Sequence, residues 1–148
     1  MNDKPVILVV DDKPQNIELI EAYLSPEGYE IVKASNGREA MGKLSSEQID
    51  MVLLDVIMPG MNGYEVCRRI KANPKTAALP VLLLTSLHQR ENMVDGMNAG
   101  ADDFITKPIE KDDLILLVRN AVRGKRLYDE KQAASASVYD KGKEWIRD

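Results

Sequence analysis

The sequence is poor in the residues that mark secreted, membrane-spanning or metal–thiolate proteins. Its 148 residues include one cysteine, Cys67, which cannot form an intramolecular disulfide and suits a reducing compartment. The one histidine, His88, has no second His or Cys nearby, and we interpret it as a surface residue. No apolar run approaches the length of a membrane span, and residues 1–5 lack the apolar core of a signal peptide. We therefore expect a cytoplasmic protein with no membrane attachment.

Excess positive charge is also missing. The formal net charge is −4 and the pI is near 5.1, which argues against direct nucleic-acid binding and against non-specific membrane-surface binding. The length corresponds to about one domain. With 44% hydrophobic residues, the chain can build a substantial core.

Short apolar runs alternate with helical patterns along the chain. Strands are expected at residues 5–10, 29–34, 51–54, 81–84 and 102–106, and helices at 14–24, 38–46, 63–72, 89–99 and from about 110 onward. This alternation predicts βαβ units, and hence a parallel sheet with right-handed crossovers. Apolar and polar residues alternate most clearly in the run at 29–34, as expected for a strand near the edge of the sheet.

Two segments have a weaker pattern. The helix at 89–99 has a sparse inner stripe of Met93, Val94 and Met97, interrupted by Gly96, and we expect it to be loosely held. Residues 124–148 are too poor in apolar residues to form a second domain. We expect a domain at 1–123 followed by a tail that prolongs the last helix, either as a linker to a further domain or as the end of a small protein. The linker is favoured because the fold needs only about 125 residues.

Charged and hydroxyl side chains follow four of the predicted strands. Asp11 and Asp12 follow the first strand, and Asp55, Thr85 and Lys107 each follow or end another. In open parallel sheets, the carboxyl ends of the strands form the functional edge. The sequence therefore predicts one site that contains all five residues, with Asp55 at its centre.

Three carboxylates repel one another unless a cation joins them. Mg²⁺ is the usual partner of a few carboxylates, water and a phosphate oxygen, so we expect Asp11, Asp12 and Asp55 to be its ligands. The backbone carbonyl of Ile57 is a candidate fourth ligand. Lys107 can neutralise a phosphoryl group, and the Thr85 hydroxyl can contact one of its oxygens. Asp55 is the expected nucleophile, because carboxylates form acyl phosphates.

These residues resemble the receiver domain of two-component response regulators over positions 5 to about 123. The resemblance includes Met58-Pro59 and Gly63 after Asp55, Ser86 after Thr85 and Pro108 after Lys107. It implies a flavodoxin-like, doubly wound α/β fold with five parallel strands in the order 2-1-3-4-5, and a cis Lys107–Pro108 bond. It also implies Mg²⁺-dependent transfer of a phosphoryl group to Asp55 from a sensor histidine kinase or a phosphotransfer protein. The chain would then be a signalling domain that catalyses only its own phosphorylation.

The resemblance further implies a switch. Thr85 would move toward the phosphoryl group, and Phe104 would rotate into the space behind it. The face made by the helix at 89–99, the strand at 102–106 and the last helix would then change its contacts with an effector domain or protein. In some members this face forms a homodimer, with an ion pair that would correspond here to Asp102 and Arg119 or Arg123.

Ile57 and Leu87 lie two positions after Asp55 and Thr85, and neither can orient an attacking water. We therefore expect a long-lived acyl phosphate. Two other interpretations are weaker. A phosphohydrolase with an Asp nucleophile would have a second acid at the position of Ile57. A flavin- or nucleotide-binding protein would have a glycine-rich loop in place of Asp11 and Asp12.

Overall fold

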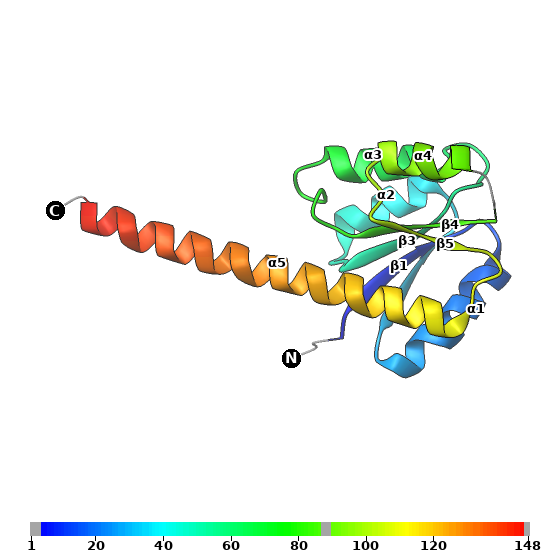
Figure 1. Ribbon diagram of the computed structural model, residues 1–148, viewed down its shortest axis with the longest axis horizontal. Helices are drawn as coiled ribbons and strands as arrows, with labels where there is room; N and C mark the ends of the chain where they lie inside the picture. The colour runs from blue at the N-terminus through cyan, green and yellow to red at the C-terminus, as the bar shows by residue number, and fades with distance from the viewer. Residues whose placement is uncertain (1–3, 87–89, 147–148) are drawn as a thin grey trace.

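The computed structural model describes residues 4–86 and 90–146, in which five strands alternate with helices (Figure 1). The elements, in chain order, are β1 (Val6–Val10), α1 (Pro14–Leu24), the 3-10 turn η1 (Ser25–Glu27), β2 (Glu30–Ala34), α2 (Gly37–Ser46), β3 (Met51–Asp55), α3 (Gly63–Ala72), β4 (Val81–Thr85), α4 (Arg90–Asn98), β5 (Asp103–Thr106) and α5 (Lys111–Ile146). Every helix and strand expected from the sequence is present.

All neighbouring strands are parallel and lie in the order β2-β1-β3-β4-β5, which confirms the flavodoxin-like fold and the edge position of β2. The register decides which strand ends meet. Val10 of β1 pairs with Leu54 of β3, so Asp11 and Asp55 leave the sheet as neighbours. Thr85 pairs with Thr106, and Lys107 follows directly.

Helices cover both faces of the sheet. α2, α3 and α4 lie on one face, and α1 and α5 lie on the other (Figure 1). Alternate residues of one strand belong to separate cores. Leu8 and Val10 pack toward the first layer, and Ile7 and Val9 toward the second. Every residue of β3 and β4 is buried, as their unbroken apolar runs predicted.

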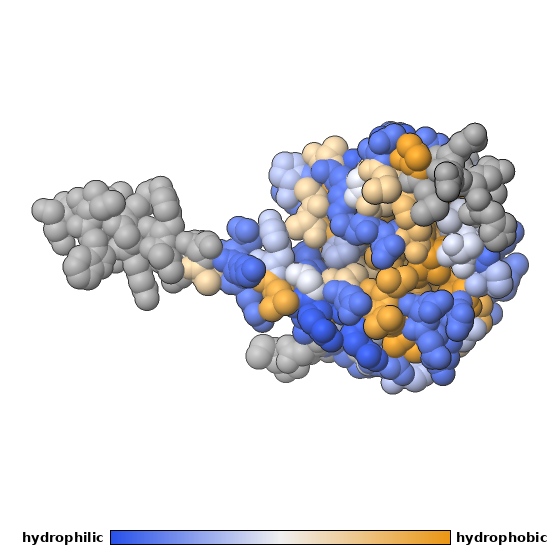
Figure 2. All heavy atoms as spheres, viewed as in Figure 1, coloured by the Kyte–Doolittle hydropathy of each residue, from blue (hydrophilic) through white to orange (hydrophobic). Residues whose placement is uncertain are grey.

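The last helix continues far beyond the sheet. Leu114, Val118 and Val122 of α5 are buried, whereas the helix itself runs to Ile146 and projects from the body of the domain (Figure 1). The helix thus continues through most of residues 124–148, and the division into a domain at 1–123 and a tail stays a prediction. In Figure 2 hydrophilic residues cover most of the described surface, and apolar side chains gather where α5 crosses the sheet.

The stripe predicted for α4 is wrong where it can be compared. Val94 is 55% exposed and Met97 is 68% exposed, whereas Gly96 and Ala99 are buried. The reason is that the ring of Phe104 fills the space beneath Gly96, so the residues that touch the sheet side are the smallest ones. The Met93 side chain, Leu87 and His88 lie outside the described residues. Within the described chain, no helix has both the length and the apolar character that crossing a membrane requires.

Candidate functional site

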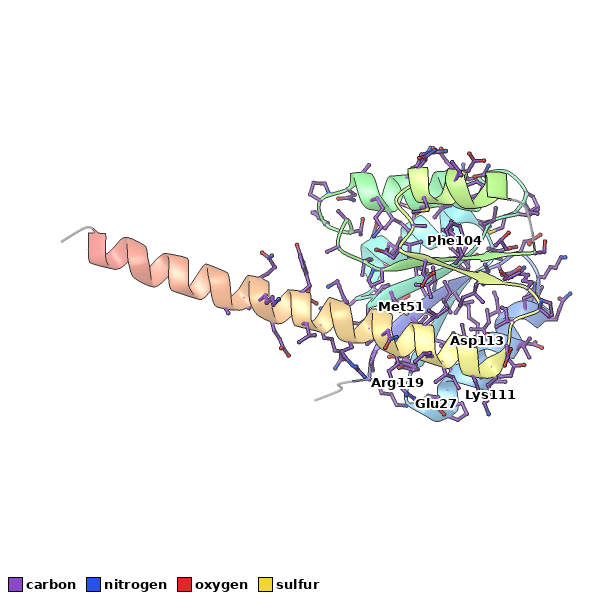
Figure 3. All side chains as sticks on the ribbon, in the orientation of Figure 1. Glu27, Met51, Phe104, Lys111, Asp113 and Arg119 are labelled. Atoms are coloured by element: carbon purple, nitrogen blue, oxygen red, sulfur yellow. The ribbon has the colours of Figure 1, made fainter. Side chains whose placement is uncertain are left out.

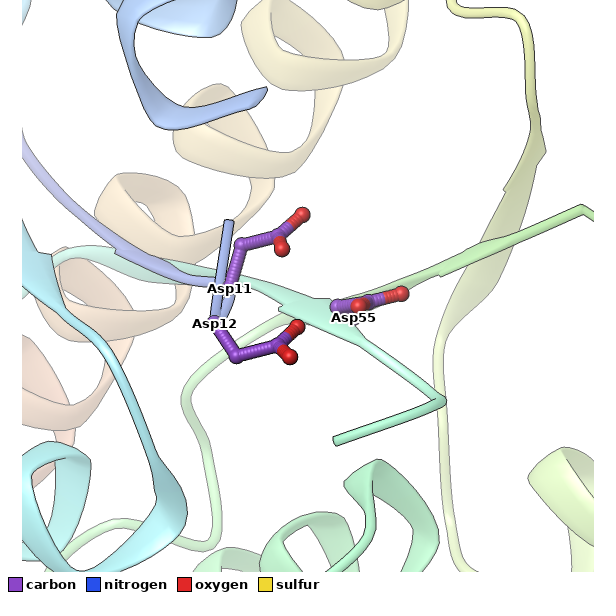
Figure 4. Close-up of side chains that lie close together, drawn as sticks. All are labelled: Asp11, Asp12 and Asp55. Atoms are coloured by element: carbon purple, nitrogen blue, oxygen red, sulfur yellow. The ribbon is translucent and has the colours of Figure 1, made fainter. Parts of the chain in front are cut away.

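Three carboxylates converge at the carboxyl edge of the sheet. Asp11 and Asp12 follow β1, Asp55 ends β3, and their side chains point toward the same region (Figure 4). One oxygen of each lies within 4.8 Å of one oxygen of each of the others. Asp11 and Asp55 are buried, and Asp12 is half-buried. The strand register therefore brings the predicted acids together.

The Asp11 carboxylate is held by the start of α1. Its Oδ1 accepts a hydrogen bond from the Lys13 backbone N–H at 2.9 Å, and its Oδ2 accepts one from Asn16 Nδ2 at 3.0 Å. These two bonds fix the orientation of a side chain that has no exposed surface. The analysis of the sequence missed Asn16. Its only signal there is an amide on the first turn of the helix that follows the acidic pair.

Asp12 has a buried oxygen without a partner. Among the described residues, Asp12 Oδ1 is the one buried side-chain oxygen or nitrogen that makes no hydrogen bond. An unpaired buried carboxylate oxygen is costly, and such atoms normally have a protein, water or ion partner. Its position beside two further carboxylates fits a hard divalent cation, which binds oxygen ligands.

Lys107 follows β5, the strand at the opposite end of the sheet from β2, and its side chain reaches the acids. Its Nζ lies 3.1 Å from Asp55 Oδ1 and 3.7 Å from Asp11 Oδ2, and its side chain is 24% exposed. The Lys107 backbone N–H donates to Thr85 O at 2.7 Å, and the following bond to Pro108 is cis, as expected. The ammonium therefore bridges two of the three carboxylates.

The pKa of Asp55 is raised above that of an ordinary carboxyl group. Burial has the largest effect, and repulsion by Asp11 acts in the same direction. The hydrogen bond from Lys107, its positive charge and the backbone N–H of Ile57 lower the pKa but do not reverse the shift. The site thus favours a bound cation, which would stabilise the ionised carboxylate.

A close backbone approach fixes the loop after Asp55. A Cβ built on Gly63 would lie 2.8 Å from Val56 Cα, so only glycine lets α3 begin against β3. The Gly63 N–H donates to Val56 O at 2.9 Å, which closes the loop. Ile57, inside it, is 62% exposed. The loop therefore holds its backbone near Asp55 and presents the Ile57 side chain to solvent.

The two residues of the expected switch lie on adjacent strands. Thr85 is 4% exposed at the end of β4. Phe104 of β5 pairs with Leu83 in the sheet, and its half-buried ring packs against the core layer beneath α4 (Figure 3). In this structure the ring thus already lies under Gly96.

Asp102, expected at a dimer contact, makes its bonds within the chain. Its Oδ2 accepts from Lys71 Nζ at 2.9 Å and from the Val81 backbone N–H at 2.8 Å. Arg119, one of its expected partners, lies near Glu27 instead, at 3.7 Å (Figure 3). An ion pair between copies would have to share the Asp102 carboxylate with Lys71.

Residues 7–119 match the family of response regulator receiver domains. The chain is 44% identical over 131 residues to Response regulator PleD of Caulobacter vibrioides, covering 88% of this chain and 29% of that protein. It is 34% identical over 118 residues to Protein PilH of Pseudomonas aeruginosa, covering 80% of this chain and 98% of PilH. The chain therefore spans less than a third of PleD but nearly all of PilH.

Solved structures of receiver domains are also similar to this chain. The signal receiver domain of a signal transduction histidine kinase from Syntrophus aciditrophicus has a TM-score of 0.77 and 39% identity, covering 81% of this chain and 91% of that one. A CheY-like receiver domain protein from Methanospirillum hungatei has a TM-score of 0.79 and 27% identity, covering 85% and 99%. These matches decide against the phosphohydrolase and flavin-binding interpretations. The chain belongs to the response regulator receiver domain family of two-component signalling proteins.

Proposed function

We propose that this chain accepts a phosphoryl group on Asp55 from the phosphohistidine of a sensor kinase or phosphotransfer protein. One observation carries the proposal: three carboxylates and the Lys107 ammonium surround one strand end, and one buried oxygen of Asp12 lacks a partner. That arrangement suits a cation and a dianionic group together.

The proposed cation is Mg²⁺. Asp11, Asp12, Asp55 and the backbone carbonyl of Ile57 would hold it. When bound, Mg²⁺ supplies positive charge to the oxygens of the phosphoryl group. The hydrogen bonds from Lys13 and Asn16 already orient Asp11, so little rearrangement of that ligand is required.

The transfer itself uses three side chains of the chain. An Asp55 oxygen forms a bond to phosphorus while the bond from phosphorus to the histidine nitrogen breaks, and the released histidine takes a proton from solvent. The Lys107 ammonium stabilises the charge on the phosphoryl oxygens as it leaves its contact with Asp55. The Thr85 hydroxyl donates a hydrogen bond to one of these oxygens. The chain is thus a signalling domain and not an enzyme with an external product.

Phosphorylation would change the α4-β5-α5 face. Movement of Thr85 toward the phosphoryl group would free space beside Leu83, into which the Phe104 ring could move more deeply. The ring supports Gly96, so its movement would release α4. α4 is the natural element to respond, because it is short and two of its apolar side chains, Val94 and Met97, are exposed.

The proposed setting is the cytoplasm, with no direct contact to nucleic acid or membrane. Response regulators interact with histidine kinases and output domains, and we propose the same two classes of partner here. Residues 124–148 would be a linker from the receiver domain at 1–123 to an effector. We also propose a homodimer through α4-β5-α5, which the oligomeric state of the chain in solution would test.

The experiment is adduct formation with phosphoramidate and Mg²⁺, followed by intact-protein mass spectrometry. We expect one phosphoryl adduct on the wild-type chain and none on Asp55→Asn or after chelation of the metal. Asp103→Asn is the matched control, because it removes the same charge from an exposed residue at the start of β5. An adduct that persists in Asp55→Asn would contradict the proposal.

A further inference from the structure

A groove of about 610 Å³ lies beside the acidic cluster. Its walls come from three segments at the carboxyl edge of the sheet: Asp12 after β1, residues 35–38 in the turn after β2 and the first turn of α2, and residues 59–61 between β3 and α3. We call it the Asp12 groove. Its volume lies in the range of pockets that bind small molecules.

The groove and the phosphoryl-binding side chains lie on opposite sides of Asp55. In the sheet order β2-β1-β3-β4-β5, the strands next to the groove are β2 and β1, whereas Thr85 and Lys107 come from β4 and β5. Lys107 occupies one side of the Asp55 carboxylate. The groove therefore lies on the side of Asp55 that Lys107 does not occupy.

The groove wall is closely packed. A Cβ built on Gly37 would lie 2.8 Å from Val66 Cγ2 and 3.1 Å from Met61 Sδ, so the start of α2 packs tightly against the β3–α3 loop. Asn36 Oδ1 accepts from the Glu39 N–H at 2.8 Å, which caps α2. The backbone of Arg38 is consequently fixed at the groove.

Glu39 completes this cap and has no free role in the groove. Its Oε2 accepts from the Ser35 N–H at 3.2 Å and from Ser35 Oγ at 2.8 Å, and these bonds lower the pKa of Glu39. The hydrogen bonds from Ser35 thus already stabilise the negative charge of Glu39, which contributes little to the recognition of a ligand.

Arg38 is the cation of the groove. Its side chain is exposed, and within the described residues no hydrogen bond or ion pair engages its guanidinium. It lies in the first turn of α2, where the helix dipole disfavours positive charge. The helix dipole therefore gives no reason for a positive charge at this position.

Arg38 and Asp12 are the charged residues that line the groove. Asp12 is also one of the carboxylates that would bind a cation. Once a cation neutralises the charge of Asp12, the Arg38 guanidinium makes the net charge of the groove positive. An anionic group would then be attracted into it, and a guanidinium binds carboxylates well because its donors match their two oxygens.

We infer that the Asp12 groove receives the non-transferred part of a small phosphodonor, and that Arg38 selects acyl phosphates that carry a second carboxylate. The inference rests on the proposed function of Asp55. In the reaction, an Asp55 oxygen bonds to phosphorus, and the bond from phosphorus to the acyl oxygen breaks. The donor leaves as a dicarboxylate, and no proton is gained or lost.

Two acyl phosphates test this selectivity. Succinyl phosphate carries the second carboxylate and acetyl phosphate does not. The second-order rate constant for labelling Asp55 in the presence of Mg²⁺ is measured for each donor by intact-protein mass spectrometry. The quantity compared is the rate constant for succinyl phosphate divided by that for acetyl phosphate. Because exposed ion pairs are modest in strength, we expect this ratio to be about fivefold larger in the wild type than in Arg38→Gln, and smallest in Arg38→Glu. Lys75→Gln, which removes an exposed charge before β4, should retain the wild-type ratio.

A binding measurement without turnover accompanies the rates. 3-Phosphonopropionate should shift the side-chain Nε–H resonance of Arg38 more than propylphosphonate does at equal concentration. Thermal unfolding of Arg38→Gln should match the wild type, since the guanidinium has no partner to lose. Equal rate ratios in the wild type and Arg38→Gln, with acetyl phosphate still labelling Asp55, would overturn the inference and leave the proposed function intact. If neither acyl phosphate labels Asp55 but phosphoramidate does, the inference fails and the proposed function stands. If phosphoramidate also fails to label Asp55, both fail.

Discussion

The ring of Phe104 on β5 occupies the space in which a side chain on Gly96 of α4 would lie. A Cβ built on Gly96 would be 2.5 Å from Phe104 Cε1 and 2.8 Å from Leu83 Cδ1. Atoms at such distances must move apart, so the sequence can carry an aromatic ring here only because position 96 lacks a Cβ. The contact connects β5, which is followed by Lys107, with α4.

Gly96→Ala should force either the ring or α4 to move. We expect the free energy of unfolding to fall by about 1–3 kcal/mol, the usual cost of an added group in a packed region. We also expect faster amide exchange in α4. Urea unfolding and hydrogen-exchange mass spectrometry measure the two effects.

Gly42→Ala is the control for this substitution. Gly42 lies within α2, and no atom comes within 4 Å of its would-be Cβ. The same change should therefore stabilise the protein by about 0.5–1 kcal/mol through helix propensity. Equal effects of the two substitutions would show that Phe104 does not fill the space beneath Gly96.

Mg²⁺ should stabilise the folded chain through Asp12. A ligand that binds only the folded state raises its stability by about 1.4 kcal/mol at ten times its Kd. Mg²⁺ should therefore raise the Tm of the wild type by several degrees, and Asp12→Asn should abolish most of this increase. Differential scanning fluorimetry at increasing Mg²⁺ measures it.

The matched control for Asp12→Asn is Glu18→Gln. Glu18 is an exposed acid on α1, away from the cluster. Its substitution should leave the Mg²⁺ effect unchanged, whereas Ca²⁺ should substitute for Mg²⁺ only weakly, because the site offers few protein ligands. A Tm increase of the same size in Asp12→Asn would refute the assignment of this residue as a ligand.

Asp55 should titrate above the usual range of a carboxyl group. Its pKa is raised chiefly by burial, with a further contribution from Asp11. Because only the ionised form is nucleophilic, the phosphorylation rate at limiting Mg²⁺ should rise as the pH increases through this raised pKa. The pKa itself can be followed by carboxyl ¹³C NMR in the metal-free protein.

Two substitutions should shift the pKa of Asp55 in opposite directions. Asp11→Asn removes a repelling charge and should lower the pKa of Asp55. Lys107→Met removes the hydrogen bond and the positive charge, and should raise it. An unchanged pKa in both variants would mean that burial alone controls the titration.

The alternation of apolar runs with helical patterns predicted the strands and the helices between them, and the strand ends predicted all three acids of the cluster. The strand order followed from the resemblance to receiver domains. Unbroken apolar runs marked the buried strands, and parallel register placed the residues after Val10 and Leu54 side by side. The packing of α4 could not be predicted this way. Its inward residue is Gly96, the residue that a search for apolar side chains ignores, because the volume beneath it comes from Phe104.

Contacts between residues far apart in sequence were also out of reach. The sequence suggested an intermolecular role for Asp102, but the structure gives its carboxylate to Lys71, 31 positions earlier. Lys71 Nζ also donates to Leu79 O at 2.6 Å, so it joins α3 to the loops before β4 and β5. No local pattern distinguishes such a lysine from a solvated one on a helix.

Ile57 should prolong the lifetime of the acyl phosphate. Its side chain is 62% exposed, two residues beyond Asp55, and it has no group that could orient water. Ile57→Asn would place an amide there, and we expect phosphate release to become about fivefold faster or more. The decay of the adduct after removal of the donor measures the rate, and Ile57→Val should decay like the wild type. Unchanged decay in Ile57→Asn would mean that water reaches phosphorus by a route that this side chain does not control.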